Sequence, residues 1–347
     1  ILRNLRSCSY LGGSETGRGL VLGLIRSKDM NPEHFFTGEG FAPPKLSKEE
    51  KLLLEQLPTR NSPDMQDWIW SIIKEDFGQE ASKIAASLKK RAPIFLRVNL
   101  SKTTLKKVIG KLSDEGIKVK MHDTVPTALR VVEMEKQITL SNCLKEGLIE
   151  LQDASSQLSV CLINPKINGP FLDLCSGGGG KSLALAAWLS KKIVASDIDP
   201  IRMSDIKTRA RRAGAKIECR NLKQVAKKKF GVVFCDVPCS GSGSWRRHPW
   251  GKWILKKQGL ENLEKKQQHI LNYASRLVIP GGLLIYVTCS ILKRENKSQI
   301  DNFLSKNQQW SQKLEKLILP SNLGDGFYIS HLVKDINDEP IGKSFRE

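Results

Sequence analysis

The chain has 347 residues, of which 40% are hydrophobic, and its 56 lysines and arginines against 36 acids give a formal net charge of +20. This length allows one large domain and a smaller one, and the charge favours a polyanionic partner, unless every protein of the organism is lysine-rich. No apolar run is long enough to cross a bilayer and no secretory leader is found, so we expect a cytoplasmic protein without a membrane partner. The eight cysteines form no CxxC pair and no histidine lies at metal-ligand spacing, so we expect no bound metal.

The first 60 residues are weakly patterned and glycine-rich, which is typical of an extension or packing arm. Within them, Ser47 followed by Glu50 is a capping-box signature that predicts a helix over residues 47–57. Apolar residues at three- and four-residue intervals then predict helices over 64–78 and 80–92.

Residues 94–150 have the pattern of a small α/β module. Its expected strands and its one expected amphipathic helix are, in chain order, 94–100, the helix 103–116, 117–121 and 128–134.

The next part of the chain alternates short apolar strands with helices. The expected strands are 170–175, 191–197, 215–219, 230–236 and 282–289, and the expected helices between them include 181–191, 200–214 and 263–278. Continuous apolar strands with helices between them indicate a parallel sheet that is covered on both faces. Ligands of such sheets bind beyond the carboxyl ends of the strands, where Cys175, Asp197, Asp236 and Cys289 all fall.

The stretch DLCSGGGGKS, residues 173–182, ends like a phosphate-binding loop. A triphosphate loop would need glycine where this chain has Cys175, and a dinucleotide fingerprint would need glycine at Ser182 or Leu183. Asp197 follows Asp173 by 24 residues, where an acid can reach ribose hydroxyls. The loop therefore suits an adenosyl ligand without phosphates, such as S-adenosylmethionine. Two alternatives stay open: a tight turn with Asp197 as a helix cap, and a nucleotide triphosphatase with Asp236 near its magnesium ion.

Two cysteines stand at loop apices after strands. Cys239 lies in DVPCSGSGSWRRHP and Cys289 in YVTCS, where neighbouring backbone amides can stabilise a thiolate. The alternative is that both are small buried hydrophobic residues, as we expect for Cys8, Cys143, Cys161 and Cys219.

The chain resembles the RsmB/Sun family of RNA cytosine-C5 methyltransferases in the order of four motifs, DLCSGGGGK, ASDID, DVPCSGSG-x-x-RRHP and YVTCS-x-x-x-x-EN. The flanking segments LQDASSQ and GDGFYIS resemble that family too. The resemblance covers residues 60–334. It implies a Rossmann-like class I methyltransferase domain with a mostly parallel seven-stranded sheet, preceded by a small α/β RNA-binding module. We accordingly expect an extension over 1–60, helices and the RNA-binding module over 61–165, the catalytic domain over 166–334 and a polar tail over 335–347.

The resemblance also implies the chemistry of the site. Cysteine is needed because cytosine C5 is too electron-poor to attack a methyl sulfonium until a thiolate has added at C6. By resemblance, Cys289 is this nucleophile, Cys239 assists release of the methylated RNA, Asp236 touches the N3/N4 edge of the base, and Lys181 positions it.

The residues that the resemblance places around S-adenosylmethionine are Cys175, Ser176, Gly177, Gly178, Gly179, Gly180, Lys181, Asp197, Arg202, Asn221 and Asp236. Two of them depart from the family pattern, which usually has proline at Gly178 and an aspartate near Asn221. We expect altered cofactor affinity rather than its loss.

The expected substrate is RNA, in particular 16S ribosomal RNA, and we expect a monomeric enzyme. Arg246 and Arg247 are candidate RNA contacts. The alternative is an RNA-binding assembly factor with a vestigial cofactor site.

Overall fold

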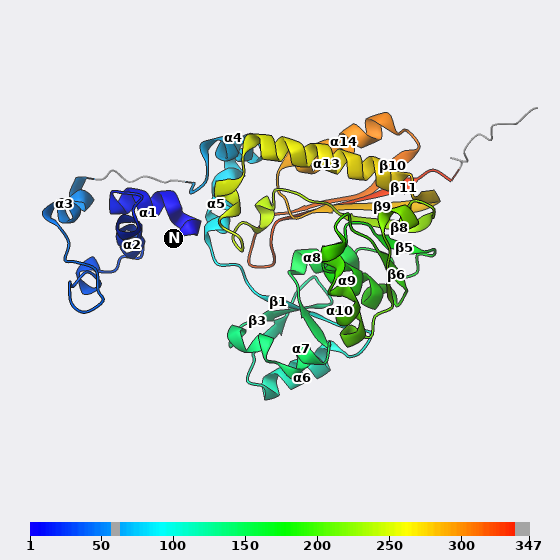
Figure 1. Ribbon diagram of the computed structural model, residues 1–347, viewed down its shortest axis with the longest axis horizontal. Helices are drawn as coiled ribbons and strands as arrows, with labels where there is room; N and C mark the ends of the chain where they lie inside the picture. Colours follow the sequence, from blue (N-terminus) through cyan, green and yellow to red (C-terminus); the bar gives the residue numbers. More distant parts are fainter. Residues whose placement is uncertain (57–62, 337–347) are drawn as a thin grey trace, which may run out of the picture. The chain divides into compact units, whose positions relative to one another are not determined.

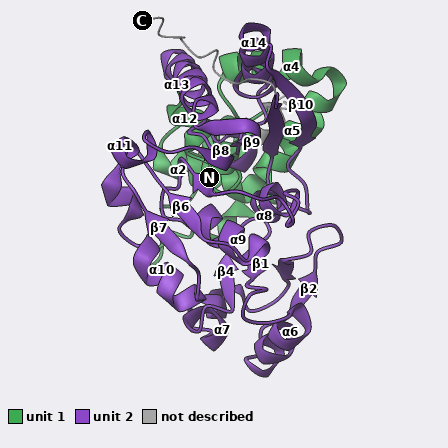
Figure 2. Cartoon of the chain, turned by 90° about the vertical axis from the view of Figure 1, so that its right-hand side faces the viewer, with its two compact units in different colours: residues 1–91, 245–255 green, residues 92–244, 256–347 purple. Residues whose placement is uncertain are grey.

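The computed structural model describes residues 1–56 and 63–336 (Figure 1). The chain divides into two compact units. Unit 1 comprises residues 1–91 with 245–255, and unit 2 comprises residues 92–244 with 256–347 (Figure 2). Each unit is described by itself below.

Unit 1 is helical. Its α-helices are α1 (Leu5–Gly12), α2 (Gly17–Arg26), α3 (Lys48–Gln56), α4 (Asp67–Phe77), α5 (Ala81–Lys89) and α12 (Gly251–Ile254). The two expected helices after residue 63 are thus confirmed as α4 and α5. Hydrogen bonds tie the inserted segment 245–255 to the rest of the unit: the Gln66 amide donates to the carbonyl of Lys252 at 2.9 Å, and Lys252 Nζ donates to the carbonyl of Arg3 at 2.9 Å.

The glycine-rich start contains helices α1 and α2, which the sequence analysis did not predict. A Cβ atom on Gly12 would lie 1.7 Å from the Gly19 carbonyl oxygen, and one on Gly23 would lie 1.8 Å from the Cys8 carbonyl oxygen. These glycines therefore let the two helices pack backbone to backbone, at the expense of the helix propensity on which sequence prediction depends.

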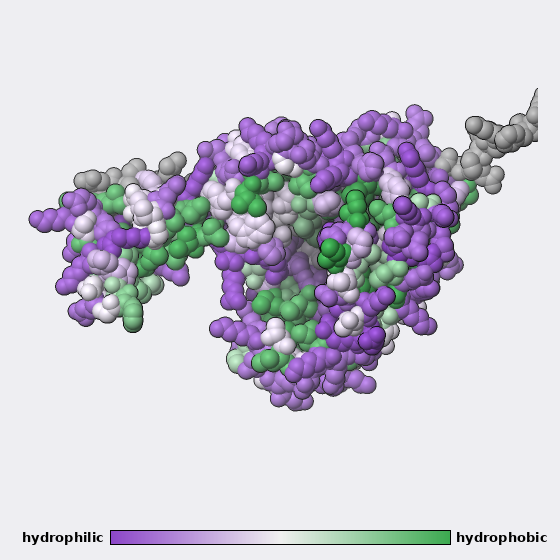
Figure 3. Space-filling view, viewed as in Figure 1, coloured by the Kyte–Doolittle hydropathy of each residue, from purple (hydrophilic) through white to green (hydrophobic). Residues whose placement is uncertain are grey.

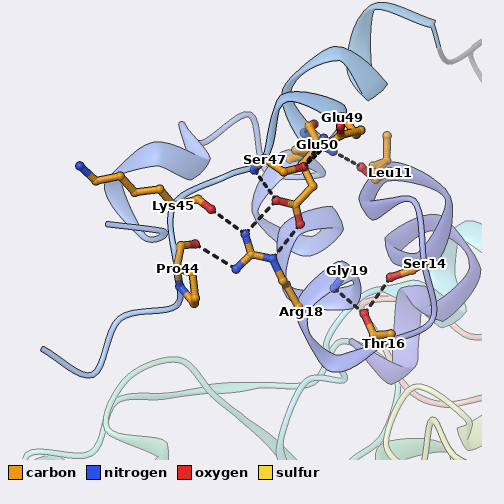
Figure 4. Close-up of polar contacts among 11 residues, drawn as sticks. Leu11, Ser14, Thr16, Arg18, Gly19, Pro44, Lys45, Ser47, Glu49 and Glu50 are labelled. Atoms are coloured by element: carbon orange, nitrogen blue, oxygen red, sulfur yellow. Dashed lines mark hydrogen bonds and ion pairs between the residues drawn. The ribbon is translucent and has the colours of Figure 1, made fainter. Parts of the chain in front are cut away.

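The predicted start of α3 is confirmed by its capping box. The Ser47 amide donates to Glu50 Oε2 at 2.8 Å, and the Glu50 amide donates to Ser47 Oγ at 3.2 Å. Glu50 also accepts two hydrogen bonds from the Arg18 guanidinium, which lowers the pKa of this carboxyl to about 2 (Figure 4). Residue 57, the expected end of the helix, lies outside the described residues.

Unit 2 begins with the small module. Its strands are β1 (Phe95–Val98), β2 (Val119–Met121), β3 (Ala128–Val131) and β4 (Ile149–Leu151), and its helices are α6 (Leu105–Asp114) and α7 (Asn142–Lys145). The sheet order is β2-β3-β1-β4 with antiparallel neighbours, which is a ferredoxin-like arrangement. The expected α/β module is confirmed, while β4 and α7 are too short to leave a periodic signal.

The large sheet of unit 2 has seven strands in the order β10-β11-β9-β8-β5-β6-β7. They are β5 (Phe171–Asp173), β6 (Ile193–Ala195), β7 (Ile217–Cys219), β8 (Phe230–Asp236), β9 (Val278–Thr288), β10 (Trp310–Ile318) and β11 (Phe327–Lys334). β11 is antiparallel to both its neighbours and the other pairs are parallel. The mostly parallel Rossmann-like fold is therefore confirmed.

Helices cover both faces of this sheet. They are α8 (Ala154–Cys161), α9 (Gly180–Leu189), α10 (Ile206–Ala213), α11 (Leu222–Val225), α13 (Lys257–Ser275) and α14 (Lys297–Lys306). One core includes Leu271 of α13 and Phe303 of α14, and the other includes Val160 of α8 and Leu185 of α9. The sheet is thus buried on both sides, which explains why its strands are continuous apolar runs.

The parallel strands place the motifs at one edge. β5, β6, β8 and β9 end at Asp173, Ala195, Asp236 and Thr288, directly before the glycine loop, Asp197, the Cys239 loop and Cys289. Hydrophilic side chains cover much of the viewed surface, with smaller hydrophobic patches between them (Figure 3). Within the described part of the chain, every helix is too short or too polar to span a bilayer.

Candidate active site

The two motif cysteines meet in unit 2. Cys239 Sγ lies 3.4 Å from Cys289 Sγ, because β8 and β9 are parallel neighbours and each cysteine follows the end of its strand. The hydrogen bond from Cys239 lowers the pKa of the Cys289 thiol, whereas the pKa of Cys239 lies well above its ordinary value. Cys289 is therefore the better thiolate of the pair.

A buried carboxylate, Glu295, holds both cysteine loops. Its Oε1 accepts hydrogen bonds from the Ser240 amide at 2.7 Å and from Gln267 Nε2 at 3.1 Å. Its Oε2 accepts from the hydroxyls of Ser240 and Ser290, both at 2.5 Å. Since Ser240 follows Cys239 and Ser290 follows Cys289, one side chain fixes the residue next to each thiol. Burial raises the pKa of Glu295.

Neither Glu295 nor Gln267 received a role in the sequence analysis. Glu295 lies six residues after Cys289 in the motif YVTCS-x-x-x-x-EN, and this fixed spacing was the one signal that could have drawn attention to it. Gln267 lies on α13, far from the motif in sequence, and gave no signal.

Lys181 and Asp236 form an ion pair at the same strand ends. Lys181 Nζ, in the first turn of α9, lies 2.5 Å from Asp236 Oδ2. Burial alone would lower the pKa of Lys181, but the charge of Asp236 outweighs it and the net shift is upward. Lys181 is therefore a permanent cation beside the cysteine pair.

The glycine loop turns sharply between β5 and α9. Gly177 and Gly179 have φ values of +49° and +78°, in the left-handed region that favours glycine. A Cβ atom on Gly179 would lie 2.8 Å from the Ile206 side chain. Asp197 Oδ2 accepts the Gly177 amide at 2.8 Å, so the acid at the end of β6 fixes the start of the turn.

The loop also holds polar atoms without a partner. Within residues 1–56 and 63–336, Asp173 Oδ1, Ser176 Oγ and Ser196 Oγ are buried and make no hydrogen bond. Asp173 Oδ2 accepts the Ser182 hydroxyl at 2.6 Å, and burial raises the pKa of Asp173 to about 7. Buried polar atoms of this kind indicate a ligand that completes their hydrogen bonds.

Apolar side chains stand beside these polar atoms. Ile198 and Ile201, which follow Asp197, are 84% and 80% exposed. Unpaired polar atoms next to exposed apolar side chains fit a ligand with both polar and apolar parts, as S-adenosylmethionine has.

The remaining predicted cofactor residues lie around this loop. Arg202 NH1 lies 3.5 Å from Asp197 Oδ2. Burial raises the pKa of Cys175, so this thiol stays protonated. Asn221 caps α11, since its Oδ1 accepts the Gln224 amide at 2.9 Å.

Arg246 does not fit the role expected for it. Residues 245–255 belong to unit 1, and Arg246 is only 2% exposed, so its guanidinium is not available on the surface for RNA. Among the described residues, no group of three or more His, Cys, Asp or Glu side chains is arranged to hold a metal ion.

Two protein-family models match the chain. The model described as 16S rRNA methyltransferase RsmB/F matches residues 160–333, about half of the chain. A second, the ferredoxin-like domain of RsmF/B-like methyltransferases, matches residues 65–137.

Individual relatives are similar over most of the chain. Ribosomal RNA small subunit methyltransferase B of Salmonella arizonae is 29% identical over 306 residues, which cover 84% of this chain and 71% of the relative. The solved structure of PH0851 has a TM-score of 0.73 at 26% identity and covers 96% of this chain and 77% of that one. NSun6 from Pyrococcus horikoshii with SFG has the same fold, with a TM-score of 0.67 at 17% identity, over 78% of this chain and 98% of that one.

Proposed function

Because the chain belongs to the RsmB/F family of 16S rRNA methyltransferases, we propose that its substrate is small-subunit ribosomal RNA. Its activity is that of an S-adenosylmethionine-dependent RNA cytosine-C5 methyltransferase. The description of the matching family and the names of the curated relatives support this substrate. The net charge of +20 suits a large RNA, because lysines and arginines on phosphates release condensed counterions.

We propose that Cys289 is the nucleophile, and the 3.4 Å approach of Cys239 is the observation that carries this assignment. The thiolate of Cys289 adds to C6 of an unstacked cytosine, and the electrons of the C5–C6 double bond become available at C5. After C5 has been methylated, a water molecule takes its proton, the electrons of that C–H bond form the C5–C6 double bond again, and the bond between sulfur and C6 breaks. Cys289 leaves as a thiolate, and the protonated thiol of Cys239, 3.4 Å away, donates its proton to this sulfur as the product leaves.

Asp236 and Lys181 orient the base in this proposal. The Asp236 carboxylate accepts a hydrogen bond from the N4 amino group at the N3/N4 edge of the cytosine, and the 2.5 Å ion pair with Lys181 holds this carboxylate in place. The hydrogen bond from Cys239 is the main cause that lowers the pKa of Cys289; within the ion pair, the Asp236 charge raises this pKa and the Lys181 charge lowers it.

The cofactor is assigned to the glycine loop. Bound S-adenosylmethionine supplies the methyl group as an electrophile. Residues 175–181 would surround it, Asp197 and Arg202 would hold its ribose, and Asn221 would contact its adenine. The unpaired Asp173 Oδ1 and the two exposed isoleucines support this placement.

The domain roles are also proposals. We assign RNA binding to residues 61–165 and catalysis to residues 166–334 of a monomeric, cytoplasmic enzyme. The intact cysteine pair and the ion pair beside it speak against an assembly factor with a vestigial site. Cys175, in place of the first glycine of a triphosphate loop, speaks against a nucleotide triphosphatase.

Two cysteine variants test the mechanism with a small-subunit ribosomal RNA transcript. Cys289→Ala abolishes methyl transfer, since no other thiolate can add to C6. Cys239→Ala leaves the adduct unresolved and produces a covalent protein–RNA band on a denaturing gel. Normal methylation by both variants would refute the roles of the cysteines. Bisulfite sequencing of cellular ribosomal and transfer RNA after deletion of the gene tests the substrate, and a lost methylcytosine in transfer RNA alone would refute it.

A further inference from the structure

Two arginines bind the backbone carbonyls of the glycine loop. Arg209 of α10 donates a hydrogen bond from NH1 to the Gly178 carbonyl. Arg97 of β1 donates from NH1 to the Gly180 carbonyl at 2.7 Å and to Gln152 Oε1 at 2.6 Å. The loop is thus held at two carbonyls, one on each side of Gly179.

Both arginines depend on the small module. Arg97 lies in its central strand and is 5% exposed, and burial lowers the pKa of its guanidinium to about 10. At neutral pH this side chain is therefore still a cation, and its hydrogen bonds are charge-assisted and strong.

Glu150 of β4 fixes the second arginine. Its Oε2 lies 3.0 Å from Arg209 NH2, and its Oε1 is bound by Arg212. Burial alone would raise the pKa of Glu150, but the two guanidiniums outweigh it and the net shift is downward. The ionised carboxylate thus orients the Arg209 guanidinium, whose other nitrogen reaches the loop.

Gly178 explains why this loop needs such support. A proline at this position would fix φ and limit the freedom of the turn, whereas glycine leaves the backbone free. Here the turn has glycine in four successive positions, 177 to 180. The Gly178 amide donates no hydrogen bond within the described part of the chain, so the carbonyl contact is what restrains this residue.

We propose that Arg209, Arg97 and Glu150 position the glycine loop for S-adenosylmethionine by restraining a turn that its four glycines leave free. The small module then has a second role besides RNA binding, since two of these residues come from its strands β1 and β4. This inference rests on the proposed placement of the cofactor at residues 175–181.

Calorimetric titration of the full chain with S-adenosylmethionine tests the proposal. Arg209→Ala frees the Gly178 carbonyl, and we expect its cofactor affinity to fall about tenfold. Arg211→Ala is the matched control, because Arg211 lies on the same helix, is exposed and makes no hydrogen bond to the loop in the described structure. Glu150→Gln gives a second variant that keeps the shape of the side chain and lowers the affinity about threefold.

Rescue by proline separates positioning from a general loss of structure. We expect Gly178→Pro, combined with Arg209→Ala, to restore the affinity to within about twofold of the unsubstituted protein. The melting temperatures of all variants are measured alongside. Full affinity in a folded Arg209→Ala protein, or failure of proline to restore it, overturns the inference.

The placement of the cofactor is tested separately with Asp197→Ala. If Asp197→Ala weakens binding but Arg209→Ala does not, the inference alone is wrong. If Asp197→Ala binds S-adenosylmethionine normally, the proposed site itself is wrong and the inference falls with it.

Discussion

The cysteine loops and the glycine loop lie at the same edge of one sheet, yet they are held in different ways. Glu295 fixes both cysteine loops from within the methyltransferase fold, only six residues after Cys289. The glycine loop is held by Arg97, and by Arg209 through Glu150, and two of these three residues belong to the small module. The cysteine loops are thus held locally, whereas the glycine loop, which Asp197 fixes at Gly177, also has two of its carbonyls held with the help of a neighbouring module.

The strongest way to break this comparison is to remove the local support. Glu295→Ala leaves the Ser240 amide, two serine hydroxyls and the Gln267 amide without their buried acceptor. We expect the variant to lose about 3 kcal/mol of unfolding free energy. Methyl transfer should fall by more than about 100-fold, because misplacing a reacting group by an ångström costs that much.

Urea unfolding and single-turnover methylation measure these two losses. Glu261→Ala on α13 is the control, since Glu261 is exposed and lies outside the network. Retention of full activity by Glu295→Ala would mean that the cysteines need no carboxylate, and the contrast between the two loops would disappear.

The sequence could predict where the strands before the site end, but it could not predict which side chains hold the loops that follow them. The strands that precede the site motifs are apolar runs, so their ends, and with them Asp236 and Cys289, could be placed from the pattern. Strands β10 and β11 were not predicted, and β10, with the sequence WSQKLEKLI, is mostly polar and only partly buried. Glu295 and Gln267 could not be placed, because a buried carboxylate with several donors has the same sequence signature as an exposed one.

Long-range contacts were beyond the sequence for another reason. Arg97 and Gly180 are 83 residues apart, and nothing in either local pattern reports that they meet. Helices α1 and α2 were missed because a glycine that permits close packing also resembles a glycine in a loop. The capping box of Ser47 and Glu50 could be predicted, in contrast, because both residues lie within one helical turn. Their spacing in the sequence is enough to bring the two side chains to each other's backbone amides.

A smaller effect sharpens the comparison on the side of the glycine loop. Burial raises the pKa of Asp173 from 3.8 to about 7, so the folded protein holds this proton more tightly than the unfolded chain. The stability that the bound proton contributes is complete below about pH 4 and is lost as the pH rises through about 7. Relative to Asp173→Asn, the unfolding free energy of the unsubstituted protein should fall by about 1 kcal/mol for each unit by which the pH rises between about 4 and about 7.

Urea unfolding of both proteins from pH 4.5 to pH 8 checks the sign and the slope. Asparagine keeps an acceptor for the Ser182 hydroxyl but binds no proton in this pH range. The unfolding free energy of the asparagine variant should therefore lack the fall with pH that Asp173 causes. Parallel curves for the two proteins would show that Asp173 is ionised throughout, as it would be if the glycine loop were open to water.

The smallest effect concerns Asn221, which caps a helix and for which we also propose a contact with the cofactor. Its Oδ1 caps α11 by accepting the Gln224 amide, and its position after β7 places it at the cofactor edge. Asn221→Asp keeps the cap, since both residues cap helices equally well, and adds a charge that strengthens a hydrogen bond to the ligand. We expect the dissociation constant for S-adenosylmethionine to fall about threefold at an unchanged melting temperature.

Asn221→Ala, which loses the cap, should instead lower the unfolding free energy by about 1 kcal/mol. An unchanged affinity in the aspartate variant would mean that Asn221 is a helix cap and nothing more, and that this chain recognises the adenine by other residues.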